Sequence, residues 1–441
     1  MPRPVLSALR RLLVPAAALA VVGGGLVPAA GAVAAAPGPV GSANSVAGSV
    51  PGDLVDAGEP ARPAAANEVA PDWSGLDVSA GVTLPDRVGV PVGEVALNPD
   101  LGLGSAGPQQ RFVYSTVDQH GAVASSTAAV FLPDGPAPEG GWPVLAWAHG
   151  TVGLGDECTP SALPRGDRDA GYLNHWLEQG YAVVASDYVG MGTPGLMSYL
   201  NGSVSAANVI DSVAAARSLD SVGTSLSSSW AVIGQSQGGG AALHVAHAAT
   251  QRSGELGLDY RGAVATGAPA YIEELVLTGS PSFPPVVLPT GLNVYTAYIL
   301  AGFREAHPEI DLDSVLSEEG RQIADMAETA CTQALTDALD GVGLSRAFTA
   351  PISSVPGLEP ALRDYMATPT DGYDKPVFVG HGLLDMDVPS PIGVILNSQM
   401  WLNQFLGSNE RVDVHWYPED HSGAMVASMA DSTPFLRSLF A

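Results

Sequence analysis

The feature that most constrains the fold of this chain is a serine inside a very tight turn bounded by glycines. Residues 234–238 read Gly-Gln-Ser-Gln-Gly and follow the apolar run Trp-Ala-Val-Ile at 230–233. The small residues at 239–243 come next and are typical of the beginning of a helix. A G-x-S-x-G segment between a strand and a helix forms a turn so sharp that only glycine fits on either side of the serine. The pattern therefore predicts that Ser236 stands exposed at the carboxyl edge of a sheet.

Short apolar runs alternate with helical stretches through most of the chain. Residues 111–116 and 122–132 are expected to form an early hairpin. In residues 205–219, apolar side chains recur at the spacing of one helix face. Near-continuous apolar runs are typical of strands buried on both faces, and strand–helix alternation predicts a doubly wound, mostly parallel sheet. The runs expected to be its strands are 143–148, 181–186, 229–233, 262–266, 376–379 and 411–417.

The alternation stops between residues 271 and 374, where no strand is predicted. Residues 275–303 contain no charged side chain, but four prolines between 281 and 289 exclude one continuous membrane-spanning helix. We expect an apolar, mainly helical cap over the site, with an ordinary buried helical layer as the alternative. The expected organisation is a signal peptide at 1–34, a flexible leader at 35–72, a core at 73–270 and 375–441, and a cap insertion at 271–374.

The N-terminal segment has the pattern of an export signal. Arg3, Arg10 and Arg11 precede an apolar stretch at 12–22, and Ala-Val-Ala at 32–34 matches a cleavage site. A membrane anchor is the alternative, and it is disfavoured because the apolar stretch is short. We therefore expect a secreted, extracellular protein.

The cysteines and the net charge indicate whether a disulfide forms and which binding partners are excluded. The chain has two cysteines, Cys158 and Cys331. In an exported protein an isolated pair usually forms one disulfide, and two free thiols are the alternative. The formal charge of −27 at pH 7 argues against non-specific binding to nucleic acid and to anionic lipid. An uncharged substrate or an apolar surface is the better expectation.

A serine hydroxyl becomes a strong nucleophile only with a histidine base and a carboxylate that orients the histidine. In enzymes with this turn, the acid and then the histidine follow the serine along the chain. His421 comes after the last predicted strand, where the base is expected, and we assign that role to it. The six histidines that follow Ser236 are His244, His247, His307, His381, His415 and His421.

The acid is expected after the preceding strand, in Gly-Leu-Leu-Asp-Met-Asp-Val-Pro at 382–389. Asp385 and Asp387 both qualify by position. The spacing G-x-x-D-x-x-V-P is common at this place in hydrolases with the same turn and selects Asp385, with Asp387 as the alternative. Asp420, beside His421, is interpreted as a solvated loop charge.

Two backbone N–H groups are needed to stabilise the oxyanion that forms when a serine attacks a carbonyl group. One is expected from Gln237, the residue after the serine. The other is expected in the loop that reads His-Gly-Thr-Val-Gly at 149–153, where glycines let the backbone approach a substrate closely. Thr151 is the candidate donor and Gly153 the alternative. His149 is interpreted as structural because it precedes the serine.

One motif suggests a nucleotide cofactor but has features that argue against it. Residues 190–195 read Gly-Met-Gly-Thr-Pro-Gly and match the G-x-G-x-x-G dinucleotide fingerprint. Pro194 removes an N–H group that a phosphate would need, and the motif does not follow the first strand. We therefore expect this segment to shape a loop beside the site. His244 and His247 lack a carboxylate partner that would complete a metal site, so neither a cofactor nor a metal is expected.

Taken together, these motifs resemble the secretory lipases of fungal lipase-A type and their bacterial relatives. The resemblance runs from about residue 73 to the C-terminus and includes Asp-Glu-Cys-Thr-Pro at 156–160 and Tyr-Pro-Glu-Asp-His at 417–421. It implies an α/β-hydrolase fold, with a doubly wound, mostly parallel sheet and an inserted, mainly helical cap over an acyl tunnel. By the same resemblance Ser236 is the nucleophile, Asp385 the acid and His421 the base.

The chain departs from the fungal pattern in two respects. Gln235 and Gln237 flank the serine where fungal members tend to have Tyr and Gly, and only one disulfide can form. The resemblance implies acylglycerols and other carboxylic esters as substrates, at an oil–water interface. We expect a secreted lipase that acts through an acyl-enzyme on Ser236. The alternatives are another extracellular serine hydrolase, either a polymer esterase or a peptidase, and a non-catalytic binding protein.

Overall fold

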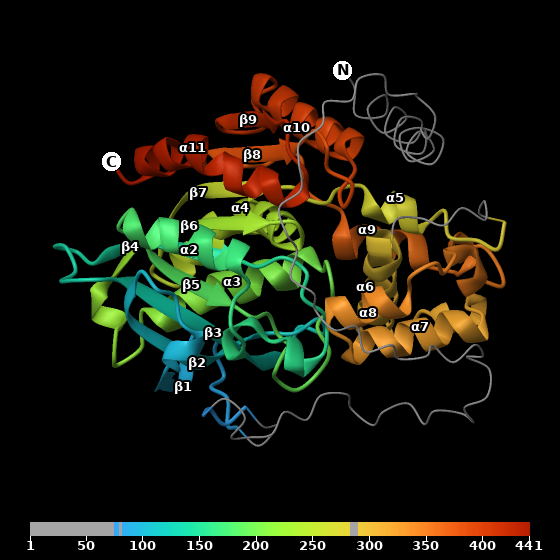
Figure 1. Ribbon diagram of the computed structural model, residues 1–441, viewed down its shortest axis with the longest axis horizontal. Helices are drawn as coiled ribbons and strands as arrows, with labels where there is room; N and C mark the ends of the chain where they lie inside the picture. The colour runs from blue at the N-terminus through green and yellow to red at the C-terminus, as the bar shows by residue number, and fades with distance from the viewer. Residues whose placement is uncertain (1–74, 79–81, 283–289) are drawn as a thin grey trace, which may run out of the picture. The chain divides into compact units, whose positions relative to one another are not determined.

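Among the described residues of the computed structural model, 75–78, 82–282 and 290–441, nine strands form one sheet (Figure 1). Their spatial order is β1-β2-β3-β5-β4-β6-β7-β8-β9. The predicted signal peptide at 1–34 and leader at 35–72 lie outside the described residues. The strands are β1 (Pro91–Ala96), β2 (Ala106–Val117), β3 (Val123–Pro133), β4 (Trp142–Ala148), β5 (Ala182–Ser186), β6 (Leu226–Gln235), β7 (Asp259–Thr266), β8 (Val377–Gly382) and β9 (Val412–Tyr417).

The sheet is parallel over most of its width. Strands β5, β4, β6, β7, β8 and β9 pair in parallel, whereas the β1–β2, β2–β3 and β3–β5 pairs are antiparallel. The predicted mostly parallel sheet is therefore confirmed, and the predicted hairpin corresponds to β2 and β3. The sequence pattern did not predict β1, because Pro91 and Gly93 are typical of loops. Proline and glycine are tolerated in β1 because an edge strand need not donate every ladder hydrogen bond.

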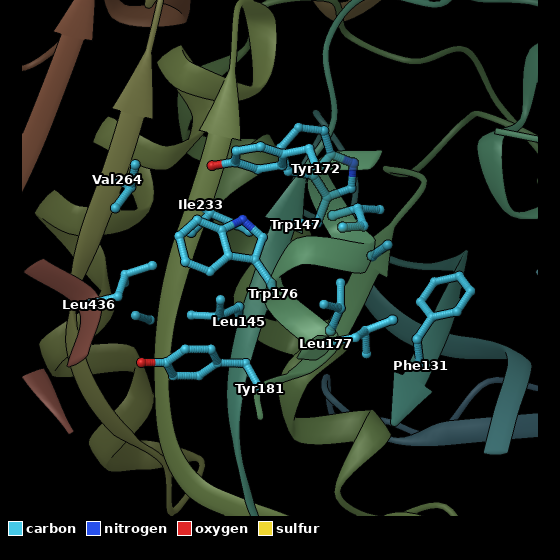
Figure 2. Close-up of a cluster of buried hydrophobic side chains, with 14 of the residues drawn as sticks. Phe131, Leu145, Trp147, Tyr172, Trp176, Leu177, Tyr181, Ile233, Val264 and Leu436 are labelled. Atoms are coloured by element: carbon cyan, nitrogen blue, oxygen red, sulfur yellow. The ribbon is translucent and has the colours of Figure 1, made fainter. Parts of the chain in front are cut away.

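Helices cover both faces of the sheet, because successive side chains of a strand point to opposite faces. Ile233 of β6 packs in a cluster of buried side chains with Trp176 of α2 and Leu436 of α11 (Figure 2). On the other face, the indole N–H of Trp230 donates a hydrogen bond to Ser253 of α4 at 3.2 Å. The helices of these layers include α2 (Asp167–Glu178), α3 (Gly202–Ala216), α4 (Gln237–Glu255), α10 (Ser390–Phe405) and α11 (His421–Leu439).

The segment between β7 and β8 contributes helices, and no strand of the sheet, within its described residues. These helices lie together beside the sheet (Figure 1). The mainly helical character agrees with the sequence, whereas the predicted boundaries at 271 and 374 stay a prediction. None of the helices in the described ranges is long and apolar enough to cross a membrane. The helices are α5 (Ile272–Val276), α6 (Thr290–Ala306), α7 (Glu318–Thr329), α8 (Thr332–Ala338) and α9 (Leu358–Met366).

A disulfide joins Cys158, in the loop after β4, to Cys331, immediately before α8. The Cα atoms of the two residues lie 5.5 Å apart. Beside this bond, the amide of Thr332 donates to the carbonyl oxygen of Val152 at 2.9 Å, and Gly153 forms an isolated bridge with Cys331. The loop after β4 is therefore fastened to the helical segment by a covalent bond and by backbone hydrogen bonds.

Replacing both cysteines by serine is expected to lower the melting temperature. The disulfide closes a loop with a sequence separation of 173 residues, which stabilises the fold by about 5 kcal/mol in the chain-entropy model. Calorimetry of Cys158→Ser/Cys331→Ser beside the oxidised parent measures the difference. An unchanged melting temperature would show that the backbone hydrogen bonds alone hold the loop.

Candidate active site

Ser236 occupies the single position between the end of β6 and the beginning of α4. Its backbone has φ 59° and ψ −126°, a positive φ that a residue with a side chain rarely adopts. The amide of Ser236 donates to the carbonyl oxygen of Thr266 in β7 at 2.9 Å. Strand β7 therefore supports the strained turn from one side.

The two glycines of the turn are required by close contacts between main chains. A Cβ atom on Gly234 would lie 2.0 Å from the carbonyl oxygen of Gly238. A Cβ atom on Gly238 would lie 1.8 Å from the carbonyl oxygen of Ala148 at the end of β4. Neither contact can be relieved by moving a flexible side chain, because both involve backbone atoms. Any larger residue at these positions would displace the turn and with it Ser236.

His421 and Asp385 form a buried hydrogen-bonded pair. The Nδ1 atom of His421 lies 2.6 Å from Oδ2 of Asp385. The structure places His421 as the first residue of α11, whereas the sequence predicts a loop. Asp420, interpreted as a solvated charge, caps this helix by accepting a hydrogen bond from the amide of Gly423 at 2.7 Å. The helix therefore fixes the position of the imidazole.

The second imidazole nitrogen of His421 remains available for proton transfer. Within the described part of the chain, Nε2 of His421 is buried and has no hydrogen-bond partner. The ring lies against Gly267, where a Cβ atom would approach Cε1 of His421 to 2.9 Å. Gly267 directly follows Thr266, whose carbonyl oxygen holds the amide of Ser236. These contacts bring the imidazole to the same end of β6 and β7 as the serine.

The two candidate carboxylates have different partners. Oδ1 of Asp385 accepts hydrogen bonds from the amides of Asp387 and Val388 at 3.0 and 2.9 Å. Oδ1 of Asp387 instead accepts a hydrogen bond from the hydroxyl of Tyr295 on α6 at 2.9 Å. Because the free oxygen of Asp385 contacts His421, the geometry favours Asp385 over Asp387 as the orienting acid.

His381 lies close to Asp385, the candidate acid, but has no predicted catalytic role. Its Nε2 atom lies 3.1 Å from the carbonyl oxygen of Val388 and 3.6 Å from Oδ2 of Asp385. Burial lowers the pKa of His381, against the opposing effect of Asp385. A neutral imidazole in this position helps to enclose Asp385 and to hold the turn at Val388.

The loop after β4 lies beside the serine, where the second oxyanion donor was predicted. A Cβ atom on Gly150 would lie 3.6 Å from Cβ of Ser236. The hydroxyl groups of Thr151 and Tyr199 share a hydrogen bond at 2.6 Å. Gly153, the alternative donor, lies further along the loop, where it pairs with Cys331. This arrangement favours Thr151 over Gly153 as the donor that accompanies Gln237.

His149 uses both ring nitrogens inside the fold. Nδ1 lies 2.7 Å from the carbonyl oxygen of Gly150, and Nε2 lies 3.3 Å from that of Asp187. Burial lowers the pKa of His149, partly opposed by these hydrogen bonds. Its contacts agree with the structural role expected from the sequence. Likewise, in the G-x-G-x-x-G segment, the amide of Gly192 donates to Asp156 at 2.8 Å and serves an internal contact.

A cavity with an empty volume of about 480 Å³ opens beside the serine. Leu275, Leu292 and Ile299, from the uncharged segment 275–303, contribute to its apolar wall. Ser236 lies on the wall of the same cavity. The polar groups on its wall include Tyr199, Gln237, Tyr295, Thr296 and Asp387. The apolar segment that the sequence singled out therefore lines a space that reaches the candidate nucleophile.

Three titratable side chains also have the geometry of a possible ion site. Asp385, Asp387 and His421 each place a potential ligand atom within 4.8 Å of the others. These atoms already take part in hydrogen bonds, including those between Asp385 and His421 and between Asp387 and Tyr295. A cation would have to compete with both bonds. The donor set therefore fits a hydrogen-bonded acid–base pair better than a metal centre.

Tyr199 and Tyr295 contribute to the site but were not found from the sequence. Their hydroxyl groups contact Thr151 and Asp387, which lie 48 and 92 residues away along the chain. No local pattern marks a tyrosine for such a contact. His244, to which the sequence assigned no role, lines a second hollow that also includes Gln237.

Comparisons with known proteins agree with this geometry. The model of the secretory lipase family matches residues 167–357. Candida antarctica lipase A superposes with a TM-score of 0.66 at 18% identity, covering 81% of this chain and 84% of that chain. The rice cell wall degrading esterase LipA from Xanthomonas oryzae superposes with a TM-score of 0.63 at 17% identity, covering 78% of this chain and 98% of that chain. A search among curated proteins finds no match.

The fold is that of an α/β-hydrolase, as the sheet order and these structural neighbours show. Over the matched residues, the resemblance to secretory lipases is confirmed. At identities of 17% and 18%, the likeness to these solved structures shows the fold alone. The family match, together with the site geometry, supports an enzyme that hydrolyses esters.

Replacing each of the two aspartates by asparagine is expected to lower activity to very different extents. Asp385→Asn should lower kcat for an ester by about 10³–10⁴-fold, because His421 loses the carboxylate that orients it and stabilises its charge. Asp387→Asn, the matched control, should cost less than about tenfold, because it leaves the contact between Asp385 and His421 in place. Steady-state kinetics on a dissolved ester measures both. The reverse ranking would move the acid to Asp387.

Proposed function

We propose that the protein is a secreted serine ester hydrolase of the lipase type. The observation that carries the proposal is the meeting of Ser236, the buried His421–Asp385 pair and an apolar cavity at one end of β6 and β7. A serine hydrolase needs a nucleophile, a base with a free nitrogen and an acid that orients the base. These groups come from three separate segments of the chain, so their convergence is specific.

The proposed reaction proceeds in two steps through a covalent intermediate. Nε2 of His421 accepts the hydroxyl proton while Oγ of Ser236 attacks the carbonyl carbon of the ester. The N–H groups of Gln237 and Thr151 stabilise the oxyanion, and His421 returns the proton to the leaving alcohol. A water molecule, activated by His421, then attacks the acyl-enzyme and releases the carboxylic acid. Asp385 orients the imidazole and stabilises its positive charge in both steps.

The cavity wall supports a substrate with an apolar acyl chain. Leu275, Leu292 and Ile299 can bury methylene groups, each of which contributes about 0.8 kcal/mol when removed from water. Acylglycerols are therefore the proposed substrates, with polymer esters and peptides as the alternatives that a substrate panel would distinguish. The disulfide and the basic-then-apolar N-terminus support secretion.

Loss of the proposed nucleophile or base should abolish ester hydrolysis without unfolding the protein. Ser236→Ala and His421→Ala are each expected to lower kcat by at least about 10⁴-fold, because residues of a triad act as a unit. A fluorophosphonate probe should label the parent and fail to label Ser236→Ala. Circular dichroism verifies the fold of each variant. Retention of a tenth of the parent activity by either folded variant would contradict the assignment.

A charge in the cavity wall should discriminate between long and short acyl chains. Leu292→Asp should lower kcat/KM for a long-chain ester at least about tenfold more than for an acetate ester, because the long chain would contact a carboxylate. Leu292→Met keeps the wall apolar and serves as the matched control. Rates on a series of esters with one alcohol and increasing acyl length measure the effect. Equal losses on short and long esters would remove Leu292 from acyl recognition.

A further inference from the structure

The exposed apolar side chains of the protein are concentrated in one short stretch. Of the twelve large apolar side chains exposed among the described residues, eight fall between residues 383 and 406. Four of them, Val394, Trp401, Leu402 and Phe405, recur at helical spacing on α10, and we call these four the α10 face. Isolated apolar groups are normal on a protein surface, but a cluster of them marks a site of interaction.

The loop between β8 and α10 adds to this apolar surface. Leu383, Leu384 and Met386 are exposed to 48%, 64% and 59%. They flank Asp385, which is buried against His421. The turn that directs the carboxylate inward therefore directs its neighbours outward. Nothing in that turn requires the outward side chains to be apolar, so their character needs another explanation.

Hydrogen bonds hold the backbone of this loop in place. The amides of Leu383 and Leu384 donate to the carbonyl oxygens of Tyr417 and Glu419 at 2.8 and 3.0 Å. The hydroxyl of Ser390, the first residue of α10, donates to the carbonyl oxygen of Leu383 at 2.8 Å. On α10 itself, the rings of Trp401 and Phe405 pack edge to face with centroids 4.4 Å apart. The surface is thus formed before any partner binds, which lowers the entropy cost of binding.

The α10 face carries no charge, although the protein is strongly acidic. None of the 16 residues of α10 is charged, whereas the whole chain has a formal charge of −27. Of the neighbouring carboxylates, Asp385 contacts His421 and Asp387 accepts a hydrogen bond from Tyr295. Glu419 and Asp420 are exposed beside the loop, on the segment that follows β9. Without cations the face has no attraction for anionic lipid. Because α10 itself has no anion, its outer face can contact an apolar phase with no charge of its own to desolvate.

We propose that the α10 face and the loop at 383–386 form the surface by which the protein docks on uncharged lipid, such as triacylglycerol or phosphatidylcholine. The inference rests on the proposed function, since lipid would then supply the substrate. Val388, two residues before α10, lines the cavity that contains Ser236. Lipid at the N-terminal end of α10 would therefore adjoin the catalytic loop, while Trp401 and Phe405 lie near the other end of the helix, which meets the start of β9. Helix α6, by contrast, buries apolar side chains such as Val294 and Leu300.

Vesicle flotation in a Ser236→Ala background tests the proposal without consuming lipid. Trp401→Ser/Phe405→Ser should lower partitioning onto phosphatidylcholine vesicles by at least about tenfold, because two large aromatic groups no longer enter the lipid. Val123→Ser/Leu163→Ser, which alters two exposed apolar residues outside the cluster, is the matched control and should bind as before. Binding to phosphatidylglycerol vesicles at low salt should be weaker than to phosphatidylcholine.

Two outcomes would overturn the proposal. Equal partitioning of the two double variants would show that the α10 face does not bind lipid. Conversion of a dimer to a monomer by Trp401→Ser/Phe405→Ser, with vesicle binding unchanged, would assign the face to a second copy of this chain. When the two double substitutions are instead made in the parent protein, which retains Ser236, both variants should hydrolyse a dissolved short ester at the parent rate. If the parent protein did not hydrolyse esters, the proposed function would be contradicted. The flotation experiment measures binding alone, so its result tests the docking surface separately from the activity.

Discussion

The candidate site depends on a contact between main chains, where the turn from β6 to α4 meets the end of β4. Gly238 lies so near the carbonyl oxygen of Ala148 that a Cβ atom would approach it to 1.8 Å. The tight turn leaves Ser236 with a φ of 59°, a conformation that costs about 1–3 kcal/mol when a side chain is present. The packed sheet and helix around the turn offset this cost. In return, the turn places the serine hydroxyl at the carboxyl edge of the sheet.

Backbone amides decide how the two neighbouring carboxylates are used. Asp385 receives two amide hydrogen bonds on one oxygen, which leaves the other to His421. Asp387 donates its own amide to Asp385 and directs its side chain to Tyr295 on α6. The same short turn therefore builds the candidate acid and links it to the helical segment. With the disulfide at Cys331, the helical segment is connected to the loops on both sides of the site.

Two uncharged apolar stretches near the site, residues 290–303 of α6 and the whole of α10, serve different purposes. In α6 they are directed inward, and Leu292 and Ile299 line the cavity beside Ser236. In α10 they also cover the outer face, where Trp401 and Phe405 are exposed. An uncharged inner wall suits an acyl chain, and an uncharged outer face suits a lipid surface. Both fit a protein whose acidic remainder repels anionic surfaces.

Local patterns in the sequence by themselves determined the strands of the parallel sheet, the turn at Ser236 and the positions of His421 and Asp385 after later strands. The strands and the turn depend on residues that are neighbours along the chain, so periodicity and turn chemistry are sufficient to predict them. His421 and Asp385 followed from the order of the groups after the serine and from a spacing common in hydrolases with the same turn. Tertiary structure alone decided that β1 joins the sheet edge, that Tyr295 contacts Asp387 and that the α10 face stays uncovered. Tyr295 and Asp387 are 92 residues apart, and α10 reads as apolar whether it is buried or exposed. Such features arise only when separate elements pack together, because a contact or an exposed face belongs to the assembly and not to any one segment.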